Sequence, residues 1–231
     1  MKNLVLYLTI NYPTREKFFE ILDIVEEFQI GYVEIGIPVS DPYIDGSIVR
    51  ESQEKVFSTL SIKEIDSVLQ EIRERYTFKW PILMTYNEGV EEFKLGQLSK
   101  TRYDAILCVD KKLPEDNFSG LVHTFTKNMD KEAINNQLAK SSQFVYLVSG
   151  EGKTGEFIQL PKDYVDIVPY LKANTQLPVF VGFGVKNSTD IASILANGAD
   201  GAIIGSEFIK RFNEGGISSI KEYLSKIRSV Y

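Results

Sequence analysis

Short apolar runs alternate with amphipathic helical stretches along the whole of the 231-residue chain. Each run has the β-branched and aromatic content of a buried strand, and each intervening stretch is long enough for a parallel crossover. Parallel strands connected in this way form either a closed barrel or an open sheet covered by helices. Strands are predicted at Leu4–Ile10, Tyr32–Gly36, Pro81–Met84, Ala105–Val109, Gly120–Phe125, Phe144–Val148, Val179–Val181 and Gly201–Ile204.

Helical patterns occupy the segments between these strands. Thr14 begins the first helix, and Ser61 is the expected N-cap of a later one. Eight strand-helix units with no linker or low-complexity break predict a (β/α)8 TIM barrel, with residues 1–231 as a single domain. The alternative is an open doubly wound sheet, which usually has fewer strands. Further helical segments are expected at 48–60, 91–98, 130–139, 164–172, 189–195, 207–212 and 218–228.

The bulk composition excludes several classes of protein. A hydrophobic content of 43% and a charged content of 25% are typical of a globular chain. The net charge of −6 argues against a nucleic-acid partner, because phosphate backbones require clustered lysines and arginines. No apolar run reaches the ~18 residues of a membrane span, and the N-terminal segment lacks a signal-peptide cleavage site. The single cysteine, Cys108, excludes an intramolecular disulfide, and a cytoplasmic location is therefore the default expectation.

Two acids mark the end of the second predicted strand. Residues 32–46 read YVEIGIPVSDPYIDG, so Glu34 ends an apolar strand and Asp45 precedes a loop glycine. A buried carboxylate is unfavourable unless it has a partner or a chemical role. In a barrel, a strand end and its following loop open on the same face, so both acids are expected at one pocket. The plainer interpretations are that Glu34 bonds to a neighbouring hydroxyl and that Asp45 caps the loop.

Glycine turns follow the last two predicted strands. Gly182-Phe183-Gly184 follows the seventh strand, and Gly205-Ser206 precedes a helical stretch after the eighth. Backbone N–H groups at such turns stabilise a phosphate dianion, and barrels commonly bind phosphate here. A Gly-x-Gly alone is often only a tight turn, so the prediction depends on both turns together. The loop at 149–155 is a candidate lid, and its spacing differs from that of an ATP-binding P-loop.

The remaining reactive side chains are expected to be structural. His123, the only histidine, lies in an apolar strand and is interpreted as a core residue with a hydrogen-bond partner rather than a base. Cys108 is interpreted as a small buried apolar side chain. Because no second histidine or cysteine lies near His123, a metal site has little support. No cofactor is expected either.

These motifs resemble those of the tryptophan synthase alpha chain family. Residues 34–46 have that family's signature, in which a strand-two glutamate, a Pro-x-Ser-Asp-Pro loop and an Asp-Gly follow in this order and spacing. The likeness extends over nearly the whole chain. It implies a lyase of tryptophan biosynthesis that cleaves indole-3-glycerol phosphate to indole and glyceraldehyde 3-phosphate. It also implies a beta chain partner in an alpha2beta2 complex.

The resemblance implies a role for each acid. Glu34 would act as general acid and base, delivering a proton to indole C3 and removing one from the adjacent hydroxyl. Asp45 would accept a hydrogen bond from the indole N–H and stabilise the positive charge that develops on the ring. The implied substrate-binding residues are Tyr7, Leu83 and Phe183 as apolar wall, Tyr146 beside the glutamate, Thr154 as the lid contact to the aspartate, and Gly155, Gly184, Gly205 and Ser206 as phosphate donors.

Some positions depart from the family pattern. Asn11-Tyr12-Pro13 replaces the usual Gly-Asp-Pro, and only Glu88-Gly89 stands after Asn87 where a longer loop is usual. Both places face the beta chain in the family, so a weaker contact with that partner is expected. Glu207 replaces a small residue after Gly-Ser, and its carboxylate would repel a phosphate unless it points away.

Two other functions stay open at this point. One is a non-catalytic barrel subunit that binds a glycerol-phosphate ligand and activates a partner beta chain. The other is a phosphate-binding barrel enzyme with a different substrate, because an apolar lining does not identify a ligand. Binding without turnover would indicate the first of these functions.

Overall fold

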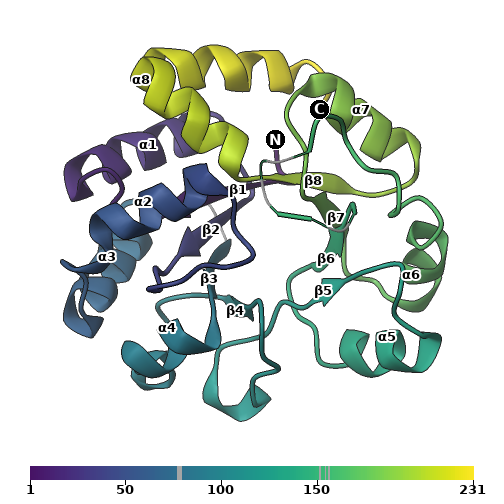
Figure 1. The fold of residues 1–231 in the computed structure, drawn as a ribbon, viewed down its shortest axis with the longest axis horizontal. Coiled ribbons are helices and arrows are strands. Elements are labelled where there is room, and N and C mark those ends of the chain that lie inside the picture. The colour runs from purple at the N-terminus through teal and green to yellow at the C-terminus, as the bar shows by residue number, and fades with distance from the viewer. Residues whose placement is uncertain (77–79, 151, 154, 156) are drawn as a thin grey trace.

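The computed structural model describes residues 1–76, 80–150, 152–153, 155 and 157–231. Eight parallel strands form one sheet in the order β4-β3-β2-β1-β8-β7-β6-β5. A parallel bridge between Ile106 and Leu121 joins its two edges and closes the barrel (Figure 1). The strands are β1 (Leu4–Thr9), β2 (Tyr32–Gly36), β3 (Trp80–Thr85), β4 (Ala105–Cys108), β5 (Thr124–Phe125), β6 (Val145–Val148), β7 (Val179–Gly182) and β8 (Gly201–Ile204).

Helices alternate with the strands and surround the barrel (Figure 1). The predicted (β/α)8 TIM barrel is therefore confirmed, and the open doubly wound sheet is excluded. Within the described part of the chain, no helix combines the length and apolar character needed to cross a membrane. The helices are α1 (Arg15–Glu27), α2 (Ser47–Phe57), α3 (Ile62–Arg75), α4 (Asn87–Glu92), η1 (Leu95–Gln97), η2 (Glu115–Asn117), α5 (Lys131–Leu138), α6 (Val168–Asn174), α7 (Ser188–Ala196) and α8 (Ser206–Arg228).

The predicted helix start at Thr14 and the predicted N-cap at Ser61 are confirmed. The side chain of Thr14 accepts a hydrogen bond from the N–H of Lys17 at the start of α1, and Ser61 accepts one from Glu64 at the start of α3. Each cap pairs one backbone donor that the first helical turn leaves without a partner. The apolar stripe of α3 is buried against the barrel through Ile65, Val68, Leu69 and Ile72.

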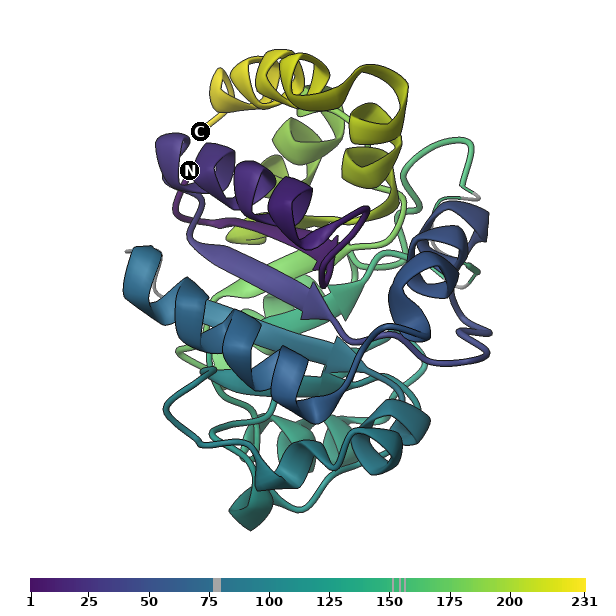
Figure 2. The ribbon, with the colours of Figure 1, turned by 90° about the vertical axis from the view of Figure 1, so that its left-hand side faces the viewer.

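Side chains alternate between the barrel interior and the layer beneath the helices. In β1, Val5 belongs to the interior cluster, whereas Leu4 and Leu6 belong to the outer cluster. The strands point toward one end of the barrel, where α2 also lies (Figure 2). Because the interior is filled with side chains, a ligand is accommodated only at that end. The buried interior cluster consists of Val5, Ile82, Ala105, Leu107, Val122, Phe144, Tyr146, Phe180 and Ile203.

Two predicted elements differ from the structure. The helix predicted at 91–98 is divided, because Lys94 adopts a left-handed conformation between α4 and η1. The two helices predicted after β8 are confirmed as the two parts of α8, which non-helical backbone at Gly215 and Gly216 separates. Strand β5 contains only Thr124 and Phe125 of the six residues predicted. Each difference lies where the local backbone rather than the apolar pattern decides the structure.

Candidate active site

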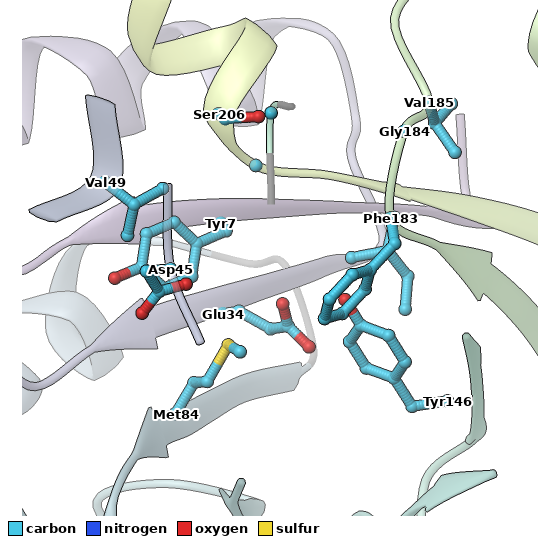
Figure 3. A pocket seen from close by; sticks show the side chains of 13 residues that line it. Tyr7, Glu34, Asp45, Val49, Met84, Tyr146, Phe183, Gly184, Val185 and Ser206 are labelled. Carbon is cyan, nitrogen blue, oxygen red and sulfur yellow. The ribbon is translucent and has the colours of Figure 1, made fainter. Parts of the chain in front are cut away.

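A cavity lies at the C-terminal ends of the strands and contains about 440 Å³ of space free of atoms, part of it open to solvent (Figure 3). Residues from five strands, from α2 and α8 and from the loops after β2, β6 and β7 surround it. They are Tyr7, Glu34, Asp45, Val49, Met84, Tyr146, Gly155, Phe183, Gly184, Val185, Ile203, Gly205 and Ser206.

Glu34 projects from β2 into the centre of this cavity (Figure 3). The residue is 1% exposed, and its Oε1 atom is buried with no hydrogen-bond partner among the described residues. Burial raises the pKa of Glu34 to about 8, because the charged form loses its hydration without gaining a partner. The carboxyl group is therefore mostly neutral at pH 7. A group in this state is able to donate a proton and then to accept one near neutral pH.

Asp45 reaches the same cavity from the loop after β2 (Figure 3). The residue is buried, and its N–H donates a hydrogen bond to the carbonyl of Pro42 within the loop, at 2.9 Å. Its Oδ2 atom accepts hydrogen bonds from the hydroxyl of Tyr86, at 3.0 Å, and from Nε2 of Gln53, at 3.3 Å. The structure thus places Glu34 and Asp45 on one cavity.

Two tyrosines fit into the site because glycines leave room for them. A Cβ at Gly36 would lie 2.2 Å from the hydroxyl oxygen of Tyr7, and one at Gly182 would lie 2.6 Å from that of Tyr146. The ring of Tyr146 also packs edge-on against Phe183, with the ring centroids 6.2 Å apart. Burial, with a smaller contribution from the negative charge of Glu34, raises the pKa of Tyr146 well above its usual value.

Backbone turns form the opposite side of the cavity. Gly155 and Gly184 have φ angles of 78° and 77°, a conformation that glycine adopts without strain. Phe183 also has a positive φ, of 71°, which is uncommon for an aromatic residue. Helix α8 begins at Ser206, directly after Gly205. Backbone N–H groups at turns of this kind and in the first turn of a helix are suitable donors for a phosphate dianion.

Glu207 follows these turns but does not line the cavity. Its Oε1 atom forms an ion pair with Nε of Arg211, at 2.7 Å, one turn further along α8. The guanidinium of Arg211 in turn lies 5.6 Å from the ring centroid of Tyr223. The carboxylate of Glu207 therefore points along its own helix and pairs with Arg211. This ion pair offsets the repulsion of a phosphate that the sequence led us to expect.

The prediction for Leu83 is wrong. Leu83 is fully buried in the layer between the strands and the helices, and the next residue, Met84, lines the cavity instead (Figure 3). Both faces of a parallel strand are buried, so an apolar run does not show which residues point inward. Thr154, predicted as a lid contact, lies outside the described residues.

His123 has the hydrogen-bond partner predicted for it, but it is half-buried and lies just before β5 rather than in the core. Its Nδ1 atom lies 3.0 Å from the hydroxyl oxygen of Ser141, and the residue does not line the cavity.

Other residues of the site gave no usable sequence signal. Tyr86 and Gln53 contact Asp45 only through the folding of three separate segments, and their spacing in the chain matches no motif.

The closed parallel barrel and the cavity at its carboxyl end define a TIM-barrel enzyme. The family model of the tryptophan synthase alpha chain matches residues 1–229. The chain is 30% identical over 229 residues to the tryptophan synthase alpha chain of Archaeoglobus fulgidus, covering 93% of this chain and 91% of that relative. It is 34% identical over 223 residues to that of Thermococcus kodakarensis, covering 90% and 88%.

A comparison with solved structures agrees with the sequence comparisons. A chain of the tryptophan synthase complex from Pyrococcus furiosus superposes with a TM-score of 0.82 at 26% identity, covering 98% of both chains. The family model and the relatives each span nearly the whole sequence. The chain therefore belongs to the tryptophan synthase alpha chain family.

Proposed function

We propose that this chain catalyses the reaction of its family, the cleavage of indole-3-glycerol phosphate to indole and glyceraldehyde 3-phosphate. The observation that carries the proposal is the buried carboxyl group of Glu34, whose Oε1 atom has no hydrogen-bond partner among the described residues and which faces a cavity opposite a set of backbone donors. The bond between indole C3 and the glycerol side chain breaks after C3 is protonated. The ring accepts the electron pair of that bond, so the residues themselves supply all the chemistry required.

Glu34 acts first as an acid and then as a base. With a pKa of about 8 it holds a proton at pH 7 and delivers it to indole C3. The resulting carboxylate removes the proton of the hydroxyl group on the carbon next to C3, and that carbon becomes the aldehyde of the product. The carboxyl group is thereby returned to its starting state, so one residue completes the proton transfers.

Asp45 accepts a hydrogen bond from the indole N–H. Protonation at C3 places a positive charge on the ring nitrogen, and a carboxylate beside it stabilises the charged state more than the substrate. Tyr7, Met84, Tyr146 and Phe183 supply apolar wall for the ring. The phosphate binds on the opposite side, on backbone donors of Gly155, Gly184, Gly205 and Ser206.

The proposal includes a beta chain partner in an alpha2beta2 complex, with a weaker contact than is usual in the family. In support of the weaker contact, α4 begins at Asn87 only two residues after β3 ends at Thr85. No extended loop therefore projects from this part of the rim. A cytoplasmic location stays our expectation for a biosynthetic enzyme of this family.

Indole release from indole-3-glycerol phosphate tests the proposed reaction. Replacing Glu34 with Gln removes the proton donor but keeps the shape, so we expect the rate to fall by about 1,000-fold or more. Glu222→Gln is the matched control, because Glu222 lies on the exposed face of α8 and pairs only with Lys226 among the described residues. Equal rates for wild type and Glu34→Gln would exclude the assigned role.

The same variants separate the proposal from the non-catalytic alternative. An activating subunit would bind a glycerol-phosphate ligand tightly and stimulate a beta chain without releasing indole. Its stimulation would also be unaffected by Glu34→Gln. An active lyase instead releases indole in the absence of the beta chain, at a rate that depends on Glu34.

A further inference from the structure

Two buried polar side chains outside the proposed catalytic pair meet at Asp45. Tyr86 is 4% exposed and Gln53 is 3% exposed, and each donates a hydrogen bond to the same oxygen, Oδ2 of Asp45. Tyr86 is the N-cap residue of α4, directly after β3, and Gln53 lies on α2. The carboxyl group at the end of the β2 loop is thus held from two separate elements.

The orientation of the Gln53 amide is fixed by its other contacts. Its Oε1 atom accepts a hydrogen bond from the N–H of Val39, at 3.1 Å, so Nε2 must face the opposite way. Nε2 then lies 3.3 Å from Asp45 and 3.4 Å from the hydroxyl oxygen of Tyr7. The amide therefore presents donors to the aspartate, and a rotated amide would lose these contacts.

The Tyr86 hydroxyl connects the same carboxyl group to its own loop. It accepts a hydrogen bond from the N–H of Ile44, at 3.2 Å, while it donates to Asp45, at 3.0 Å. The ring of Tyr86 packs against Tyr43, with the centroids 5.3 Å apart. One hydroxyl thus fixes both the side chain of Asp45 and the backbone immediately before it.

We propose that Tyr86 and Gln53 are positioning residues, which hold the carboxylate of Asp45 in the orientation that receives the indole N–H. The proposal rests on the function proposed above and adds two residues that do not themselves contact the reacting atoms. A hydrogen bond to a charged acceptor depends strongly on direction, so a carboxylate free to rotate would stabilise the charged ring less well. Both donors are neutral, so they orient the carboxylate without forming an ion pair with it.

The test measures recognition of the N–H group separately from turnover. The probes are 3-(indol-3-yl)propyl phosphate, which lacks the reactive hydroxyl groups, and its benzofuran counterpart, in which oxygen replaces N–H. The wild type is expected to bind the indole probe about tenfold more tightly, because only that probe donates a hydrogen bond to Asp45. Tyr86→Phe and Gln53→Met each remove one donor at nearly constant shape and are expected to reduce this preference to about twofold.

Two control variants carry the same kinds of substitution at residues that do not line the cavity. Tyr103→Phe and Gln137→Met alter equally enclosed residues that do not line the cavity, and both are expected to keep the tenfold preference. In steady-state assays, Tyr86→Phe and Gln53→Met are expected to raise KM about fivefold, in line with the loss of probe preference, and to lower kcat about tenfold. A merely structural role would leave the tenfold probe preference intact, whatever its effect on kcat and KM.

The outcomes separate this inference from the proposed function. If the wild type prefers the indole probe and both variants keep that preference, the positioning role is wrong and the proposed reaction stands. If the preference is present and sensitive to both variants but no indole is released, the positioning role stands and the proposed reaction is wrong. A wild type without any preference would overturn both. If Tyr86→Phe does not fold, Gln53→Met still decides the question.

Discussion

At the scale of single residues, the buried carboxyl of Glu34 has a thermodynamic consequence. Burial makes this group hold its proton more tightly in the folded chain than in the unfolded chain. Its pKa rises from 4.5 to about 8 on folding. Such a residue reduces stability at the pH where the enzyme works, which is a common property of catalytic groups.

The pH dependence of unfolding tests this consequence. Below pH 4.5 both states are protonated, but between pH 4.5 and 8 the unfolded chain releases a proton that the folded chain keeps, so stability falls as pH rises. Glu34→Gln lacks this loss and is expected to be more stable by about 3 kcal/mol at pH 7, with little difference at pH 4.5. Urea unfolding of both proteins at pH 4.5, 7 and 8.5 measures the difference. A difference that does not change with pH would contradict the assigned pKa.

At the scale of single elements, the start of α8 combines two functions that a substitution can separate. Its first turn stabilises negative charge, and it also faces the cavity where the phosphate is proposed to bind. An acidic side chain there would improve the helix and repel the ligand. The effects on folding and on binding are therefore opposite in sign.

Ser206→Asp is expected to raise KM about 100-fold, because a carboxylate would lie beside the phosphate. The melting temperature is expected to stay unchanged or to rise slightly, because an acid at the first helical position is favourable. Ser188→Asp is the matched control, since Ser188 is the first residue of α7 and does not line the cavity. Similar KM values for the two variants would argue against phosphate binding at α8.

Some elements of the fold could be predicted from the sequence, and others could not. Strand β2 and the cap of α3 could be predicted because composition and a local hydrogen bond determine them. The inward residue of β3 could not, because Leu83 and Met84 are both apolar and the strand is covered on both faces. The break at Lys94 depends on a single left-handed residue, and no apolar pattern reports it.

At the scale of the whole molecule, the closed barrel could be predicted from the alternating pattern of strands and helices, but the contacts at its seam could not. The seam between β4 and β5 consists of one bridge, in which Ile106 donates to the carbonyl of Gly120 and Val122 donates to that of Ile106. The contacts of Tyr86 and Gln53 with Asp45 could not be predicted from the sequence either. They join segments whose approach depends on the finished fold.

The seam is expected to be the part of the barrel that opens most easily. The amides of Ile106 and Val122, which form the seam, should exchange with deuterium at least tenfold faster than those of Leu6 and Leu8 in β1. Strand β1 is paired along its length with β2 and for three residues with β8, which protects it. Hydrogen exchange followed by mass spectrometry measures the two segments together. Equal protection would show that the barrel opens as one unit.

The backbone conformation and the cavity-lining position of Phe183 favour different residue types. Its positive φ suits glycine, whereas its ring forms cavity wall beside Tyr146. A library at this position screened only for survival of heating should therefore enrich glycine and asparagine. The same library screened for growth of a tryptophan auxotroph should retain aromatic residues. A difference between the two populations would show that the aromatic ring at position 183 lowers the stability of the fold and is kept for the proposed catalytic pocket.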